Sequence, residues 1–145
     1  MIRYMLDTNA CIAVINSRPP AVRIRLLELD PIEVAVSEIV RYELAFGVCN
    51  SSMPERNQAN LTHFLRYVQV LEWTEAQSVA AAQIRCDLAR EGRPIGHYDT
   101  LIAAHARSLD ACLVTNNTRE FSRVAGLQIE DWTLPRSASP QSPSK

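Results

Sequence analysis

The sequence predicts a single α/β domain built around a parallel β-sheet. Short apolar runs of strand length alternate along the chain with longer segments in which apolar residues recur at helical spacing. No internal repeat or long linker interrupts this alternation, and 145 residues is an ordinary length for one domain. Strands separated by helices pair in parallel through right-handed crossovers, so we expect helices on both faces of the sheet.

The first half of the chain contains two units in which a strand leads directly into a helix. The apolar runs at 2–6 and 32–36 are the strands, and each is followed at once by a residue that caps helices, Asp7 in the first unit and Ser37 in the second. Prolines bound two further helical segments. The helices expected in this half therefore occupy residues 8–15, 21–29, 38–48 and 54–67.

The clearest helix of the second half begins at a capping box. Thr74 and Gln77 stand just before an apolar periodicity that ends at Gly92, which predicts a helix over 75–90. The other expected elements are a helix at 99–109 and strands at 68–73, 111–115 and 127–132. From residue 134 onward the sequence is rich in Pro and Ser and has no apolar periodicity. We therefore expect a folded domain over 1–133 and a disordered tail over 134–145 that folding does not require.

Three acidic residues interrupt stretches that otherwise have the pattern of a buried core. They are Asp7 at the end of the first strand, Glu43 on the core-facing stripe of its helix, and Asp99 at the inner edge of a helix start. A buried carboxylate is costly unless a cation or hydrogen-bond donors accompany it. Each acid has an ordinary alternative, since Asp7 and Asp99 also suit helix N-termini and Glu43 a solvated surface. Together the three positions favour one shared purpose, a metal site at the sheet edge where α/β proteins bind ligands.

Repulsion among these acids is the reason to expect a metal. Two carboxylates about 4 Å apart repel by roughly 1 kcal/mol in water and by about 4 kcal/mol at an effective dielectric constant of about 20. A divalent ion relieves this repulsion, and Mg²⁺ prefers a few carboxylate oxygens together with water and substrate phosphate. The histidines lack the spacing of zinc ligands, so we interpret them as structural or surface residues: His63, His97 and His105.

Composition excludes several other classes of function. The formal net charge is −1, so no global basic field indicates nucleic-acid binding, and any such binding must be local. Fourteen of the 15 basic residues are Arg and the only Lys is Lys145, which excludes functions that need a lysine inside the fold, such as a Walker-type phosphate loop. The four cysteines are widely spaced and are expected to be reduced core thiols. Because no stretch resembles a signal peptide or a membrane span, we expect a cytoplasmic protein without membrane contact.

Four sequence blocks stand in an order and spacing that characterise a known family. They are Met5-Leu-Asp7-Thr-Asn9, Ser37-Glu-Ile-Val-Arg-Tyr-Glu43-Leu-Ala-Phe-Gly47, Ile95-Gly-His-Tyr-Asp99-Thr-Leu-Ile-Ala-Ala-His-Ala106 and Leu113-Val-Thr115-Asn-Asn117-Thr-Arg-Glu120-Phe121. With these blocks the chain resembles the PIN-domain ribonucleases, and most of all the VapC toxins of bacterial toxin–antitoxin pairs. The resemblance extends to Trp132. It implies a three-layer α/β/α sandwich whose parallel sheet has about five strands in the order 3-2-1-4-5.

The resemblance also implies which residues form the site. Asp7, Glu43 and Asp99 would be the metal-binding acids, and Asn117 stands where many PIN domains carry a fourth acid. This substitution weakens the expectation of a second metal ion. We expect Asn117 to face Asp7 across the sheet edge and to hold a water molecule by hydrogen bond.

Several other residues have supporting roles in this interpretation. Thr8 and Thr115 would contribute hydroxyl groups behind the acids, although a helix cap and a strand-end hydroxyl explain them equally well. Glu120 either supplies the charge that Asn117 lacks or lies on the surface of the next helix. The arginines considered for steering an RNA backbone are Arg41, Arg107, Arg119 and Arg123.

The implied activity is metal-dependent endonucleolytic cleavage of RNA, with tRNA or another structured RNA as the target. One Mg²⁺ or Mn²⁺ held by Asp7 and Asp99, with Glu43 binding directly or through water, would activate a water for attack on the phosphodiester. VapC-like toxins are homodimers that a cognate VapB-like antitoxin holds inactive. Both partners are therefore implied, as is a larger toxin–antitoxin assembly that binds operator DNA through the antitoxin.

Two other classes of function fit parts of the sequence. A PIN scaffold that has lost catalysis would act as a protein- or RNA-binding module, which the three intact acids argue against. A phospho-acceptor signalling domain also gathers acids and Mg²⁺ at strand ends, but this chain lacks an acidic pair after the first strand and any internal Lys. RNA cleavage that requires a divalent metal is the observation that separates the enzyme from the binding module.

Overall fold

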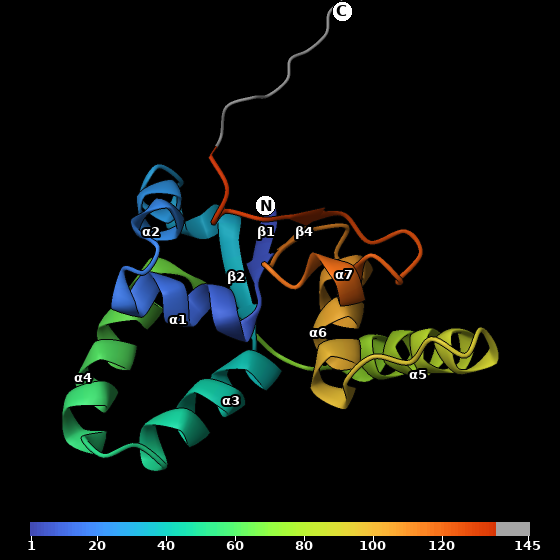
Figure 1. Cartoon of the computed structure of the whole chain (residues 1–145), viewed down its shortest axis with the longest axis horizontal. Coiled ribbons are helices and arrows are strands. Elements are labelled where there is room, and N and C mark those ends of the chain that lie inside the picture. Colours follow the sequence, from blue (N-terminus) through green and yellow to red (C-terminus); the bar gives the residue numbers. More distant parts are fainter. Residues whose placement is uncertain (136–145) are drawn as a thin grey trace, which may run out of the picture.

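The computed structural model describes residues 1–135 and contains a five-stranded sheet in the order β3-β2-β1-β4-β5 (Figure 1). Its strands are β1 (Tyr4–Leu6), β2 (Val34–Ser37), β3 (Gln69–Leu71), β4 (Cys112–Val114) and β5 (Ile129–Glu130). Every adjacent pair is parallel. The predicted parallel sheet and its strand order are both confirmed. The tail expected at 134–145 lies, beyond Pro135, outside the described residues.

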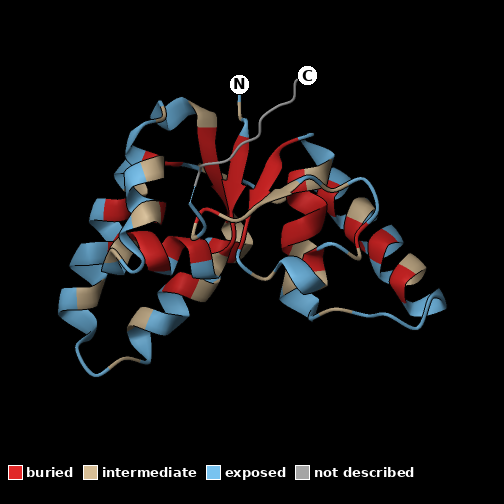
Figure 2. Cartoon of the chain, turned by 45° about the horizontal axis from the view of Figure 1, so that its top comes forward, coloured by how far each residue is buried: buried red, intermediate tan, exposed pale blue. Residues whose placement is uncertain are grey.

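The three central strands form the core of the sheet. All residues of β1, β2 and β4 are buried, whereas the edge strands β3 and β5 are half-buried or exposed (Figure 2). A parallel strand covered by helices on both faces has no solvent side, which is why these strands are continuous apolar runs. Since β1 and β4 lie side by side in this buried centre, the polar residues that directly follow the two strands also lie close together.

Helices flank the sheet in two groups (Figure 1). On one side lie α1 (Thr8–Asn16), α2 (Pro20–Leu27), α3 (Glu38–Cys49) and α4 (Pro54–Phe64), and on the other lie α5 (Glu75–Arg90) and α6 (His97–Ser108). The short α7 (Thr118–Phe121) connects β4 with β5. Within residues 1–135, no helix is both long and apolar enough to cross a membrane.

Several element boundaries differ from the prediction, two of them because the chain forms a 3₁₀ turn. The strand expected from residue 32 begins at Val34, because the preceding residues form a 3₁₀ turn, η1 (Pro31–Glu33), that the Asp30 side chain caps. The helix expected to reach residue 67 ends at Phe64 and continues as a second 3₁₀ turn, η2 (Leu65–Tyr67). The helix expected from residue 99 begins earlier, at His97.

The cysteines match their expectation only in part. All four are free thiols, but Cys49 is exposed and Cys86 is half-buried, so only Cys11 and Cys112 are core residues. Burial and the neighbouring Glu130 carboxylate raise the pKa of Cys112 to about 12. The Cys112 thiol is therefore protonated and unreactive at neutral pH.

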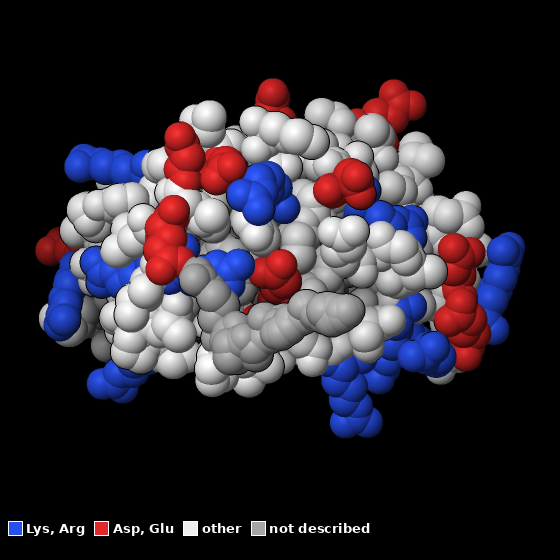
Figure 3. All heavy atoms as spheres, turned by 90° about the horizontal axis from the view of Figure 1, so that it is seen from above, with Lys and Arg blue, Asp and Glu red and all other residues white. Residues whose placement is uncertain are grey.

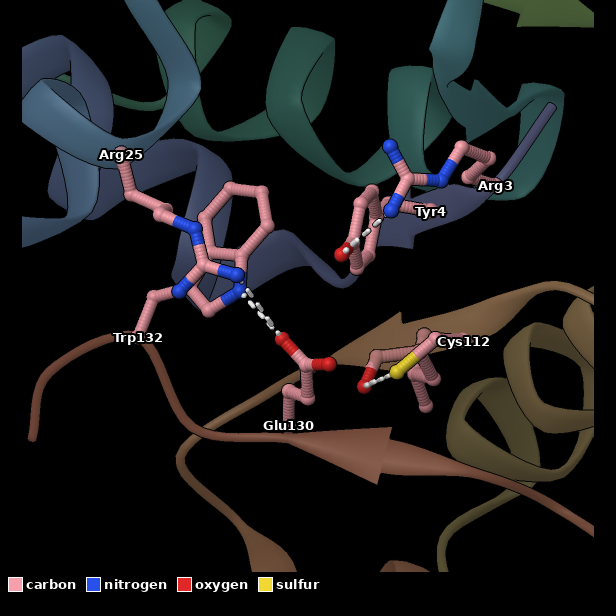
Figure 4. Close-up of polar contacts among 7 residues, drawn as sticks. Arg3, Tyr4, Arg25, Cys112, Glu130 and Trp132 are labelled. Atoms are coloured by element: carbon pink, nitrogen blue, oxygen red, sulfur yellow. Dashed lines mark hydrogen bonds and ion pairs between the residues drawn. The ribbon is translucent and has the colours of Figure 1, made fainter. Parts of the chain in front are cut away.

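The carboxyl-terminal strand is fastened to α2 by a cluster of aromatic and charged side chains (Figure 4). Trp132 is 4% exposed, its indole N–H donates to Glu130 at 3.0 Å, and its ring lies edge-on against Tyr4. The Arg25 guanidinium lies over the Trp132 ring and forms an ion pair with Glu130 at 3.5 Å. The cluster joins β1, β5 and α2, so the last part of the described chain closes the core.

Candidate active site

Asp7 is a deeply buried acid at the junction of β1 and α1. It is 4% exposed, and its Oδ1 caps α1 by accepting the backbone N–H of Ala10 at 2.8 Å. The Thr115 hydroxyl also donates to this carboxylate. Burial raises the pKa of Asp7 above its ordinary value, and the two hydrogen bonds partly oppose the increase. Asp7 is thus both a helix cap and a buried charge close to other acids.

Glu43 approaches Asp7 from α3. The Thr8 hydroxyl donates to Glu43 Oε1 at 2.5 Å, which ties the first residue of α1 to the second turn of α3. Glu43 is half-buried, and its negative charge contributes to the raised pKa values of both Asp7 and Asp99. The structure therefore brings the three predicted acids together, with Thr8 orienting one of them.

Asp99 enters the cluster from the other side of the sheet, on the first turn of α6. Its pKa is raised to about 6, chiefly by burial and then by the charges of Glu120, Asp7 and Glu43. The Asp99 and Glu120 carboxyl groups share a hydrogen bond, which requires a proton on one of them. Glu120, whose role is left open by the sequence, therefore belongs to the same cluster. We call Asp7, Glu43, Asp99 and Glu120 the acidic cluster.

Asn117 lies at the start of α7, behind the acidic cluster. Its side-chain amide donates to Glu120 at 3.4 Å, and its backbone N–H donates to the Thr115 hydroxyl at 2.9 Å. Thr115 is 1% exposed and donates in turn to Asp7. The structure thus connects Asn117 with Asp7 through Thr115, and Asn117 orients Glu120 directly.

The charge of the acidic cluster is not neutralised by neighbouring bases. Of the ion pairs formed within residues 1–135, none includes a member of the cluster. Like charges held together in this way attract a divalent cation, and a set of carboxylate oxygens suits Mg²⁺ or Mn²⁺. In the described part of the chain, no group of three or more acid, histidine or cysteine side chains is placed so that it could hold a metal ion as it stands. By its chemistry the donor set fits such an ion, but the carboxylates would have to come closer together to hold it.

The raised pKa of Asp99 predicts that the metal-free protein loses stability as the pH rises. The folded state holds the Asp99 proton more tightly than the unfolded state, so this contribution is complete below about pH 3.8 and is lost as the pH rises through about 6. We discount the effect to about 1 kcal/mol for solvent screening of this half-exposed group. Asp99→Asn removes the charge, so near pH 8 the variant should melt roughly 2–8 °C above the wild type.

Thermal melts followed by circular dichroism in a chelator, near pH 5 and near pH 8, measure this effect. The difference between variant and wild type should be clearly smaller near pH 5 than near pH 8, because the folded protein still holds most of the Asp99 proton at pH 5. It should vanish only below about pH 3.8, where the unfolded chain is protonated as well. Added Mg²⁺ should raise the wild-type melting temperature near pH 8 more than that of the variant. An equal difference at both pH values would show that charge repulsion is not its cause.

The buried His105 joins α6 to the start of α3. It is 1% exposed, and its Nδ1 lies 2.8 Å from the Ser37 hydroxyl, which also accepts the Ile39 N–H and so caps α3. Burial lowers the pKa of His105, so the ring is neutral near pH 7. His105 therefore has a structural role: it keeps the helices that carry Glu43 and Asp99 in a fixed relation.

The four arginines expected to steer RNA differ in whether their side chains already form an ion pair or hydrogen bonds within the protein. Arg41 forms an ion pair with Glu38 at 2.6 Å, and Arg107 and Arg123 donate to backbone carbonyl groups. Arg119 is exposed on α7. The face seen from the top of Figure 1 carries interspersed acidic and basic side chains (Figure 3). No basic surface is therefore gathered on that face.

Comparison with known protein sequences gives a consistent result. A family model described as PIN domain matches residues 4–127. The chain is 46% identical over 133 residues to the tRNA(fMet)-specific endonuclease VapC of Shigella flexneri, covering 92% of this chain and 100% of that protein. It is 40% identical over 132 residues to ribonuclease VapC2 of Haemophilus influenzae, covering 91% of this chain and 99% of that protein.

Solved structures show the same similarity. The crystal structure of DNA-bound VapBC from Salmonella typhimurium matches with a TM-score of 0.86 and 42% identity, covering 91% of this chain and 99% of that chain. VapBC2 from Rickettsia felis, bound to a DNA fragment from its promoter, matches with a TM-score of 0.85 and 38% identity over the same shares of the two chains. The similarity therefore covers almost all of the described chain, including every strand of the sheet.

Proposed function

The chain belongs to the PIN-domain family, and from this premise we propose that it is the toxin ribonuclease of a toxin–antitoxin pair. The observation that carries the proposal is the acidic cluster at the carboxyl edge of the sheet, whose charge no base among residues 1–135 neutralises. A module that only bound RNA would be weakened by several carboxylates facing a polyanion. The same cluster is useful to an enzyme that binds a divalent ion and brings a phosphodiester to it.

Asp7 and Asp99 are the residues that would hold the metal, with Glu43 as a further ligand. Bound there, Mg²⁺ or Mn²⁺ would supply a nucleophilic water at neutral pH and offset negative charge on the reacting phosphate. The chain's own contribution is orientation. Thr115 holds the Asp7 carboxylate by a hydrogen bond, and Thr8 does the same for Glu43.

Glu120 has a different place in the mechanism. It shares a hydrogen bond with Asp99 and accepts another from the Asn117 amide, so its carboxyl group is held at the edge of the acidic cluster. We assign Glu120 to orienting Asp99 beside the metal ligands, with Asn117 as the residue that positions it.

The expected result is RNA cleavage that depends on a divalent cation. Purified antitoxin-free protein, incubated with total tRNA, should give discrete fragments with Mg²⁺ or Mn²⁺ and none with a chelator, because phosphodiester attack by water needs the activation that the ion supplies. Restoring the ion after chelation should restore the fragments, which controls for damage by the chelator. Tight tRNA binding without cleavage under all of these conditions would instead support the catalytically inactive scaffold.

The RNA target that we propose is a tRNA. The relative from Shigella flexneri, at 46% identity, is named as specific for tRNA(fMet). A narrow target also fits a chain whose formal net charge is −1, since sequence-independent, long-range attraction to RNA is weak without a net positive charge. Sequencing of RNA ends after brief induction identifies the target and the cleaved bond.

An apolar groove beside Glu43 offers a binding place for the antitoxin. It lies between α1, α3 and α4, has a volume of about 240 Å³, and is lined by apolar side chains that include Ile12, Val48 and Leu61. A segment bound in this groove would end at Glu43 and cover the acids. The similar solved structures are VapBC complexes with DNA. We therefore assign inhibition and operator-DNA binding to a VapB-like antitoxin, and expect the toxin itself to form a homodimer.

A further inference from the structure

Two exposed tyrosines form a pair at the mouth of the acidic cluster. Tyr42 precedes Glu43 on α3, and Tyr98 precedes Asp99 on α6. Their ring centroids are 5.8 Å apart with an interplanar angle of 42°, and their hydroxyl groups share a hydrogen bond. Tyr42 is 56% exposed and Tyr98 is 45% exposed. The pair therefore connects the two helices that supply the acids while leaving large aromatic faces in water.

The tyrosine pair lies next to the acidic cluster because each tyrosine directly precedes one of its acids in the sequence. Neighbouring residues on a helix point about 100° apart, so a side chain next to a metal-ligating acid lies beside the site without entering it. The ring contact between Tyr42 of α3 and Tyr98 of α6 places the pair beside both acid-bearing helices. A substrate whose phosphate lies at the acidic cluster would bring the adjoining nucleotide over these rings.

The charges around the acidic cluster do not favour binding of the RNA backbone. The acidic cluster repels the phosphates of RNA, and the nearby Arg41 is engaged by Glu38 through two hydrogen bonds. Attraction to the bases does not suffer from this repulsion. Stacking of a base on an aromatic side chain is favourable for every base, because each has a π-face.

We infer that Tyr42 and Tyr98 form a stacking platform for an unpaired base next to the cleaved bond. This inference rests on the proposed ribonuclease activity and names residues that bind its substrate. The two rings already contact each other, so the base stacks on an outer face of the pair rather than between the rings. A base inside an RNA duplex is stacked on its neighbours and is unavailable, so the nucleotide at this position must be unpaired.

The experiment compares leucine and phenylalanine variants on an RNA whose cleaved bond has been mapped. Tyr42→Leu and Tyr98→Leu keep an apolar side chain but remove the π-face, whereas Tyr42→Phe and Tyr98→Phe keep the ring and remove the hydroxyl. Each leucine variant should raise KM by about 5–100-fold with little change in kcat, because stacking binds substrate and transition state alike. The phenylalanine variants should retain most of the affinity that the leucine variants lose, because they keep the aromatic ring.

Tyr67 supplies a matched control. It is 37% exposed on η2, where it contacts His63 rather than any member of the acidic cluster, so Tyr67→Leu should leave KM unchanged. Circular dichroism melts and light scattering of every variant separate loss of binding from loss of folding or of dimers. If the leucine variants become monomeric while the phenylalanine variants do not, the pair belongs to an interface between copies and the inference is wrong.

A modified substrate tests the stacking directly. Each of the two nucleotides that flank the cleaved bond is replaced in turn with an abasic residue. One of the two replacements should raise KM for the wild type by the same factor as the leucine substitutions do. The same replacement should raise KM little further when the enzyme is a leucine variant. Additive penalties from the two changes would overturn the inference. Wild-type cleavage with unaltered KM in both leucine variants would overturn it too, leaving the ribonuclease proposal intact, whereas absence of cleavage by the wild type would contradict that proposal instead.

Discussion

Asp7→Asn and Asp99→Asn are each expected to lower the rate of RNA cleavage by about 10²–10³-fold or more, because each variant removes charge that holds the metal against the reacting phosphate. Asn is nearly the same size as Asp, so packing around the buried Asp7 is kept. Removing one of several like charges also relieves repulsion, so folding should be undisturbed. Initial rates on the mapped tRNA measure the effect, and growth after induction measures it in cells.

Asp110→Asn is the matched control for these variants. Asp110 lies just beyond the carboxyl end of α6, the helix whose first turn carries Asp99, and it is exposed. Its φ of 55° is a conformation that Asn also adopts readily, so this change should affect neither rate nor folding. Undiminished toxicity of the Asp99→Asn protein, at equal expression, would remove Asp99 from the site.

The sequence was sufficient to find acids that break an apolar pattern. Asp7 follows a buried strand, and Glu43 and Asp99 stand on helices beside core residues, so each is conspicuous in a linear reading. Glu120 breaks no such pattern, because it lies in a four-residue helix after a polar turn. Its membership of the acidic cluster depends on its hydrogen bond with Asp99, which exists only after β4 has been placed beside β1.

Two further features, the tyrosine pair and the start of β2, could not be predicted from the sequence. Tyr42 and Tyr98 are unremarkable in isolation, since each lies on the exposed side of its own helix and only the approach of α3 to α6 makes them a pair. The boundary at Val34 was hidden because the apolar residue Ile32 continues the strand pattern while Pro31 and Asp30 favour a turn. Local turn chemistry prevailed over hydrophobic pattern at that position.

Trp132→Ala is expected to be the most damaging single change to the fold, costing about 3–5 kcal/mol of the free energy of unfolding. The family match ends at residue 127, yet Trp132 is 4% exposed and is held by aromatic contact, by the Arg25 guanidinium and by a hydrogen bond. Truncation to Ala empties this space and leaves Glu130 without its indole donor. Against a typical total of about 5–15 kcal/mol, the melting temperature should fall by more than about 10 °C.

Trp132→Phe divides this effect into its parts. Phe keeps an aromatic ring between Arg25 and Tyr4 but cannot donate to Glu130, so it should lose only about 1–2 kcal/mol. Urea unfolding of both variants measures the two losses. Equal losses of unfolding free energy would mean that the hydrogen bond to Glu130, and not packing, provides the stabilisation by Trp132. If the large loss for Ala is found, the folded unit must include β5 and Trp132, because a domain ending at residue 127 would lack the side chain that closes its core.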